Sequence, residues 1–84
     1  MSRTKWCTVR VLKNGRQDWP YGYATVAGKV SGWGGITSDV ETDDEGYATL
    51  EWELGDHLEK IYVSGQTFQG PFEEGRRYTL RYEV

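Results

Sequence analysis

Residues 42–50, with the sequence Thr-Asp-Asp-Glu-Gly-Tyr-Ala-Thr-Leu, constrain the fold more than any other part of this chain. A polar residue leads into an acidic turn, a glycine ends the turn, and polar and apolar residues then alternate. An Asp at the start of a turn accepts hydrogen bonds from backbone N–H groups, and a Gly adopts positive φ without steric penalty. We therefore predict a β-hairpin whose turn is shaped by Asp43 and Gly46.

Apolar residues alternate with polar ones along much of the chain, and this two-residue period is typical of half-buried β-strands. The alternating ranges, each with the side chains expected to share its inner face, are 6–12 with Cys7, Val9 and Val11; 23–30 with Ala24, Val26 and Val30; 36–42 with Ile36, Ser38 and Val40; 47–54 with Ala48, Leu50, Trp52 and Leu54; and 77–84 with Tyr78, Leu80, Tyr82 and Val84.

Two further strands complete the pattern, one that starts at Ile61 and a short irregular one around Phe68. Turns or loops are predicted at three places, 14–15, 17–21 and Pro71. We therefore predict an all-β fold, a small antiparallel Greek-key β-sandwich of about six or seven strands. A chain of 84 residues is expected to form one domain, covering residues 1–84.

One segment also fits a helix. Leu54, Leu58 and Ile61 follow the i, i+4, i+7 spacing of a helical face, and Asp56 and Glu59 have the spacing of a capping box. A short helical turn therefore stays open here. We prefer a turn that leads into a strand, because the sequence Ile-Tyr-Val favours β-structure.

Hydrophobic residues make up only 37% of the chain, which is a thin supply for the interior of so small a domain. Trp, Tyr and Phe make up 14%, and each ring buries a large apolar area, so their first interpretation is core packing. The single cysteine, Cys7, excludes an internal disulfide. Because it lies in an apolar strand pattern, we predict a buried and inert thiol.

No stretch approaches the roughly 20 apolar residues of a membrane helix, and no apolar segment follows the charged N-terminus. We expect no membrane partner, no signal peptide and no cofactor. The compartment stays open: the cytoplasm if the chain is complete, or the extracellular space if it is a domain of a larger secreted protein.

The formal net charge of -3 is distributed unevenly. Residues 39–59 contain nine acidic residues and no Lys or Arg, whereas residues 3–29 contain six basic residues and one Asp. We interpret this as acidic strands lying near basic ones. Because a net acidic chain is repelled by phosphate at long range, no nucleic-acid partner is expected.

The order of these features resembles the transthyretin-like (prealbumin-like) β-sandwiches, especially the carboxypeptidase regulatory-like domains and their bacterial surface-protein relatives. The resemblance runs from Thr8 to the end of the chain and is strongest in the T-D-x-x-G-x-A-x-L motif at 42–50. It implies a structural role for Asp43 and Gly46. One enzymatic branch that hydrolyses a purine-breakdown intermediate carries several histidines and a Tyr-Arg-Gly-Ser signature, which this chain lacks, so the resemblance implies no activity.

Neither of the candidate catalytic groups forms a complete site in the sequence. His57 is the single histidine, and a catalytic histidine needs a nucleophile or an orienting acid beside it. Glu51 and Glu53 lie about 7 Å apart on one strand face, a spacing that a glycosidase uses only inside a cleft. We expect a surface histidine, a solvated strand face and no cleft. The chain is therefore predicted not to be an enzyme, and a small hydrolase built on His57 is the least favoured alternative.

Three adjacent acidic residues, Asp43, Asp44 and Glu45, offer the oxygen ligands that Ca²⁺ accepts. Their spacing lacks the repeated pattern and the terminal Glu of an EF-hand loop. We interpret them as a turn with surplus charge and predict no metal site.

Four aromatic residues fall in loops or at strand starts: Trp19, Tyr21, Tyr23 and Trp33. Rings that cap the open ends of the sandwich are the first interpretation. The alternative is a binding surface, for which Trp33 between glycines is the strongest candidate.

We predict a non-enzymatic interaction module that binds a protein partner through its loops or a strand edge. A carbohydrate-binding module that uses Trp33, Trp19 and Tyr21 is the alternative, with a glycan as the partner. A monomer is slightly favoured over a homodimer, because charged side chains on the last strand oppose edge-to-edge pairing.

Overall fold

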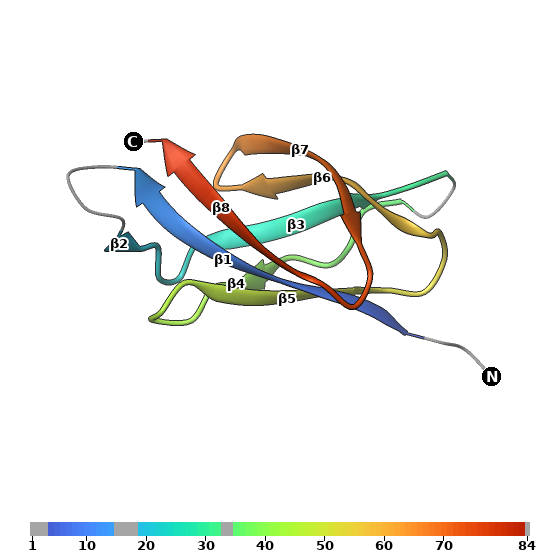
Figure 1. Cartoon of the computed structure of the whole chain (residues 1–84), viewed down its shortest axis with the longest axis horizontal. Coiled ribbons are helices and arrows are strands. Elements are labelled where there is room, and N and C mark those ends of the chain that lie inside the picture. The colour runs from blue at the N-terminus through green and yellow to red at the C-terminus, as the bar shows by residue number, and fades with distance from the viewer. Residues whose placement is uncertain (1–3, 15–18, 33–34, 84) are drawn as a thin grey trace.

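The computed structural model describes residues 4–14, 19–32 and 35–83, and their strands form two stacked β-sheets (Figure 1). No helix occurs among these residues. The predicted all-β sandwich is therefore confirmed. The strands are β1 (Lys5–Asn14), β2 (Trp19–Pro20), β3 (Thr25–Val30), β4 (Val40–Glu41), β5 (Tyr47–Trp52), β6 (His57–Val63), β7 (Gln66–Glu73) and β8 (Arg77–Glu83).

The first sheet is built around β1. Strand β5 pairs with residues 5–10 of β1 and β8 with residues 8–14, so the two lie on opposite edges of β1 where these ranges overlap. The short strand β2 pairs with Leu12 and Lys13, on the same edge as β5. The β1–β8 pairing is parallel, whereas all other strand pairings in the described residues are antiparallel.

The second sheet has the order β4-β3-β6-β7. The connections β3–β4 and β6–β7 stay within this sheet, while the chain crosses between the sheets from β2 to β3, β4 to β5, β5 to β6 and β7 to β8. Strands β5 and β4 therefore lie as edge strands of their sheets on the same side of the sandwich.

The interior is filled by alternating residues from both sheets. From the first sheet these are Cys7, Val9, Val11, Ala48, Leu50, Trp52 and Leu80, and from the second Ala24, Val26, Val30, Leu58, Ile61, Val63 and Phe72. The two-residue period thus predicted most of the core correctly. Among the remaining rings, those of Tyr21, Phe68, Tyr78 and Tyr82 are partly buried against its margin.

The predicted strand at 36–42 is wrong in extent and in the face that it buries. Only Val40–Glu41 forms β4, and Ile36 is 66% exposed. The buried residues are instead Thr37 and Thr42. Their hydroxyl oxygens accept hydrogen bonds from the backbone N–H groups of β3 and its approach, Thr37 Oγ1 from Gly28 at 2.9 Å and Thr42 Oγ1 from Ala24 at 2.8 Å. The need to satisfy buried N–H groups therefore outweighs the apolar pattern here.

The segment around residue 54 also differs from the prediction. Leu54 is 72% exposed rather than inward, because the chain bends after β5, and β6 begins at His57 with no helical turn. Leu58 and Ile61 both face the core although they are three residues apart. A register shift between Leu58 and Lys60 accounts for this spacing, since a β-bulge adds one residue to the strand.

Two predicted loops contain strand residues. Trp19 and Pro20 pair with Lys13 and Leu12 as β2, where a proline is tolerated because the strand lies at an edge. Pro71 lies within β7, another edge strand, rather than in a turn. The predicted turn at 14–15 lies partly outside the described residues, and Val84 lies wholly outside them.

Replacement of Thr42 by Val tests the role of its hydroxyl group. We expect T42V to lower the free energy of unfolding by about 1–3 kcal/mol, because the buried Ala24 N–H loses its acceptor. Urea denaturation measures the change. T25V is the control, since Thr25 is exposed on the neighbouring strand, and it should stay within about 0.5 kcal/mol of the wild type.

Burial raises the pKa of the Cys7 thiol from 9.0 to about 11. The thiol of the unfolded chain ionises at lower pH than that of the folded chain, so stability present below pH 9 is lost as the pH rises towards 11. We expect a loss of about 2–3 kcal/mol over this range, measured by urea denaturation at several pH values. A C7A variant should lack this component of the pH dependence; an identical profile in both proteins would contradict the assignment.

Candidate functional site

The predicted aromatic surface is only partly assembled. Trp19 is 61% exposed and Tyr23 is 72% exposed, with Tyr23 in a left-handed conformation at φ 59°. Tyr21 is instead partly buried and packs against the core. Its ring meets that of Tyr82 edge to face at 4.9 Å between centroids, and the Lys13 ammonium lies 4.7 Å from its centroid.

Trp33 lies outside the described residues. Its described neighbours Ser31 and Gly35 follow β3 at the end of the sandwich opposite to β2 (Figure 1). The three-residue carbohydrate surface of Trp33, Trp19 and Tyr21 therefore stays a prediction.

Hydrogen bonds within the acidic turn hold its shape. Asp43 Oδ1 accepts hydrogen bonds from the N–H groups of Glu45 and Tyr47, both at 2.9 Å, and the Gly46 N–H donates to the Asp43 carbonyl oxygen at 3.0 Å. Gly46 has a φ of 89°. Asp43 and Gly46 thus shape a tight turn. The predicted β-hairpin is wrong, because β4 and β5, which flank this turn, belong to different sheets and do not pair. In the part of the chain that the structure describes, no group of three His, Cys, Asp or Glu side chains is placed to hold a metal ion.

His57 begins β6 and is half-buried. Its backbone is bonded to Ser31, whose N–H donates to the His57 carbonyl oxygen at 2.9 Å. Within the described ranges, no hydrogen bond or ion pair is formed by its imidazole ring.

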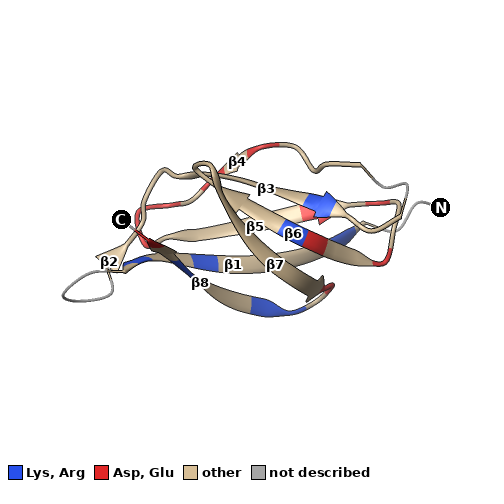
Figure 2. Ribbon diagram, turned by 90° about the horizontal axis from the view of Figure 1, so that it is seen from above, with Lys and Arg blue, Asp and Glu red and all other residues tan. Residues whose placement is uncertain are grey.

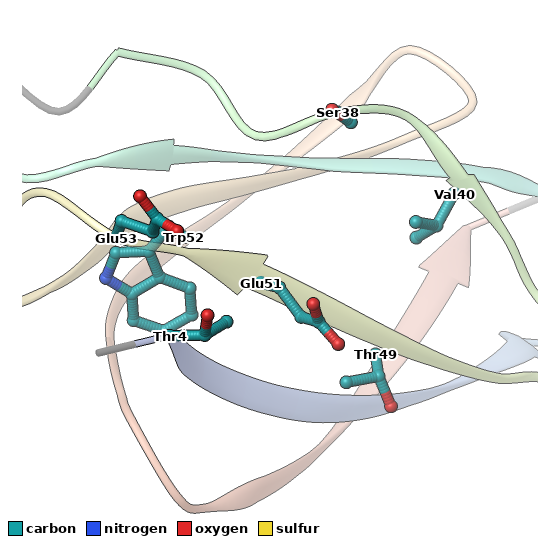
Figure 3. Close-up of a pocket in the computed structure, with 7 residues that line it drawn as sticks. All are labelled: Thr4, Ser38, Val40, Thr49, Glu51, Trp52 and Glu53. Carbon is teal, nitrogen blue, oxygen red and sulfur yellow. The ribbon is translucent and has the colours of Figure 1, made fainter. Parts of the chain in front are cut away.

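A groove lies beside β5, between this strand and the segment that leads into β4 (Figure 3). Its larger hollow has a volume of about 480 Å³ and is lined by Thr4, Ser38, Val40, Thr49, Glu51, Trp52 and Glu53. A second hollow of about 290 Å³ shares Ser38, Glu51, Trp52 and Glu53 with the first and continues to Val30, Ile36, Thr37 and Leu54. The two hollows form one groove that follows the end of β5.

The indole of Trp52 forms part of the groove wall. The residue is only 6% exposed, and its Nε1 is buried with no hydrogen-bond partner among the described residues. In Figure 3 this nitrogen lies on the side of the ring turned away from Glu51. A buried N–H group without an acceptor is destabilising.

The backbone along the groove is also unpaired on one side. Val11 exchanges its hydrogen bonds with Gly46 and Tyr21, so alternate residues of β1 turn their N–H and C=O groups towards β5. Because Cys7 pairs with Leu50 in this register, the backbone N–H and C=O groups of Leu50 point towards β1. The backbone N–H and C=O groups of Thr49 and Glu51 therefore point away from β1, towards the edge of the sheet. Strand β5 has no other strand neighbour in the described sheet.

The groove carries acidic side chains on its β5 wall. Glu51 lies on β5 and Glu53 directly follows it, and both are exposed and line the groove. Asp39 and Glu41 flank Val40 in the facing segment and are exposed, but they are not among the lining residues. Figure 2 shows the acidic residues along the segment with β4, and Lys and Arg along β1 and β8. The Lys5 ammonium reaches the far end of the groove, where it donates to the Glu53 carbonyl oxygen at 3.1 Å.

The sequence identified part of this site. Glu51 and Glu53 stand out in the alternating pattern, but the expectation that no cleft forms beside them is wrong, because the groove runs along both. The facing wall could not be found from periodicity, since the strand predicted at 36–42 would have closed the gap. The signal that was available is the polar run Thr-Ser-Asp at 37–39, which is a weak strand former.

In comparisons with known proteins, no family model matched the chain, and neither did any curated protein or any solved structure. The class that the fold itself defines is therefore an all-β sandwich of two sheets. In the described residues, no helix has the length and apolar character needed to span a membrane.

The turn that precedes β5 can be tested at Gly46. A Cβ atom there would collide with the Val11 carbonyl oxygen, in addition to the strain of positive φ. Gly65 has a nearly equal φ of 90° and open space around its Cα, so G65A isolates the conformational cost of about 1–2 kcal/mol. We expect G46A to destabilise the domain clearly more than G65A in thermal and urea denaturation. Equal losses would show that the close approach to β1 is unimportant.

Proposed function

We propose that this domain is a non-enzymatic interaction module that binds an extended segment of a protein partner along the free edge of β5. The observation that carries the proposal is the coincidence of an unpaired strand edge with a groove beside it. Backbone groups at the edge supply affinity when a partner strand is added, and pockets for alternate side chains supply specificity. Both elements of this recognition mode are present at Thr49 and Glu51.

We also propose that the sandwich is transthyretin-like and related to the carboxypeptidase regulatory-like domains. The support is local: residues 42–50, which carry the resemblance, form the Asp-Gly turn and the first residues of β5. The two four-stranded sheets are compatible with this assignment. Domains of this kind are expected to act through binding surfaces rather than through chemistry.

The arrangement of the ionisable groups supports a binding role over a hydrolytic one. Glu51 and Glu53 are both exposed, whereas a general acid needs an environment that favours its protonated form. His57 has no carboxylate partner within the described ranges. A substrate in the groove would thus meet surface charges and backbone groups rather than a paired acid and base.

A glycan remains the alternative partner, because Trp19 and Tyr23 are exposed at the β2 end of the sandwich. Stacking of a sugar on Trp19 would change tryptophan fluorescence. We expect no change when the protein is titrated with a panel of neutral and acidic oligosaccharides. A saturable change that is lost in the W19A variant would favour the carbohydrate-binding function instead.

A proline at residue 49 tests the binding edge. The Thr49 N–H points away from β1, so T49P should fold while removing a donor that a partner strand needs. Random short peptides displayed on phage are selected on the wild-type domain and then measured against T49P and T49V. We expect the selected peptides to lose binding to T49P and to keep it with T49V, which retains the N–H group.

Amide hydrogen exchange provides a second measurement if T49P proves unstable. A bound strand should slow the exchange of the Thr49 and Glu51 amides in the wild-type protein. Selected peptides that leave both amides unprotected, or a library that yields no binders, would overturn the proposed function.

A further inference from the structure

We infer that the segment bound at β5 is basic and alternating, with Lys or Arg on its outer face and small apolar residues on its inner face. This inference rests on the proposed function, since it assigns the chemistry of the partner strand at the same edge. It follows from the side-chain directions along β5, the two glutamates of the groove and the hollow beside Trp52.

The register of β5 fixes which side chains a partner strand would meet. Thr49 and Glu51 are exposed on the outer face of the first sheet, while Leu50 and Trp52 face the core. Because a strand added at the edge continues the same pleat, its side chains alternate in the same way. Its outward residues would lie beside Thr49 and Glu51, and its inward residues would enter the groove beside Trp52.

The outward positions call for positive charge. Glu51 and Glu53 lie along this edge, and neither takes part in the ion pairs found in the described residues, which join Lys29 to Glu59 and Arg76 to Glu73. Opposite charges on neighbouring strands are favourable, and like charges directly opposite one another are unfavourable. The segment therefore carries Lys or Arg beside these glutamates.

The inward positions call for small apolar residues. The hollow of about 480 Å³ lies between the first sheet and the segment before β4, where Val40 is half-buried and Ser38 is exposed. Aliphatic side chains from the partner would bury the open side of this hollow.

A second copy of this chain offers a similar pattern in β8, where Arg77 and Thr79 are exposed and Leu80 is buried. Its free edge is partly occupied, however. The Gln66 side chain donates from Nε2 to the Glu83 carbonyl oxygen at 2.5 Å and accepts from the Glu83 N–H at 3.0 Å. This obstructs strand addition at the end of β8, so we assign the edge of β5 to a different chain.

Three synthetic peptides test the inference: acetyl-Lys-Val-Lys-Val-Lys-Val-Lys-amide and its counterparts with Glu or Thr in place of Lys. We expect the Lys peptide to bind at least about tenfold more tightly than the Glu peptide, with an advantage that shrinks as salt is added. Its binding should also shift the Trp52 indole N–H resonance, which is assigned with W52F.

A matched pair of charge variants locates the effect. The double variant E51Q/E53Q and the single variant E74K each raise the net charge by two, but Glu74 lies in the turn between β7 and β8. We expect E51Q/E53Q to weaken the Lys peptide about tenfold and E74K to leave it within about twofold.

The outcomes separate this inference from the function on which it rests. Equal binding of the Lys, Glu and Thr peptides, all sensitive to T49P, would overturn the basic partner while keeping the strand edge. Binding insensitive to T49P would overturn both. Concentration-dependent self-association in analytical ultracentrifugation, abolished by T49P, would instead assign the edge to a second copy of this chain.

Discussion

Two threonine hydroxyl groups decide how far the second sheet extends. Thr37 and Thr42 each donate their N–H to a carbonyl of the β3 region and accept an N–H from the same residue, Gly28 and Ala24 respectively. Each threonine thus makes a closed two-point contact in which a side-chain oxygen replaces a backbone carbonyl. Between the two threonines, the chain pairs with β3 only through the short strand β4. The space between this segment and β5 is the groove.

The same contacts explain what the sequence could and could not predict. The two-residue period is a burial signal, so it placed Val9, Leu50 and Leu80 correctly. The period does not reflect the need of a buried backbone N–H group for an acceptor. It therefore predicts Ile36 inside and Thr37 outside, whereas the structure has them the other way round. It also treats strands as regular, whereas the bulge in β6 brings Leu58 and Ile61 to one face.

The groove was less predictable than the core because it is a tertiary feature. Glu51 and Glu53 could be named from the alternating pattern, but the facing wall comes from a separate segment, with Ser38 and Val40, on the other side of the acidic turn. An unsatisfied indole nitrogen is likewise invisible in a sequence, since most buried Trp residues find a partner. Trp33 lies outside the described residues, so the part of the aromatic prediction that concerns it stays a prediction.

The two outer edges of the first sheet are chemically unequal. On β8 the Gln66 amide occupies the outward backbone groups of Glu83, whereas on β5 the outward groups of Thr49 and Glu51 have no such cover. A sheet with two bare margins would act as a template in both directions and could grow into a fibre. The Gln66 amide obstructs one margin at Glu83, so a strand added at the β5 margin, as proposed, would end the assembly and would not extend it into a polymer.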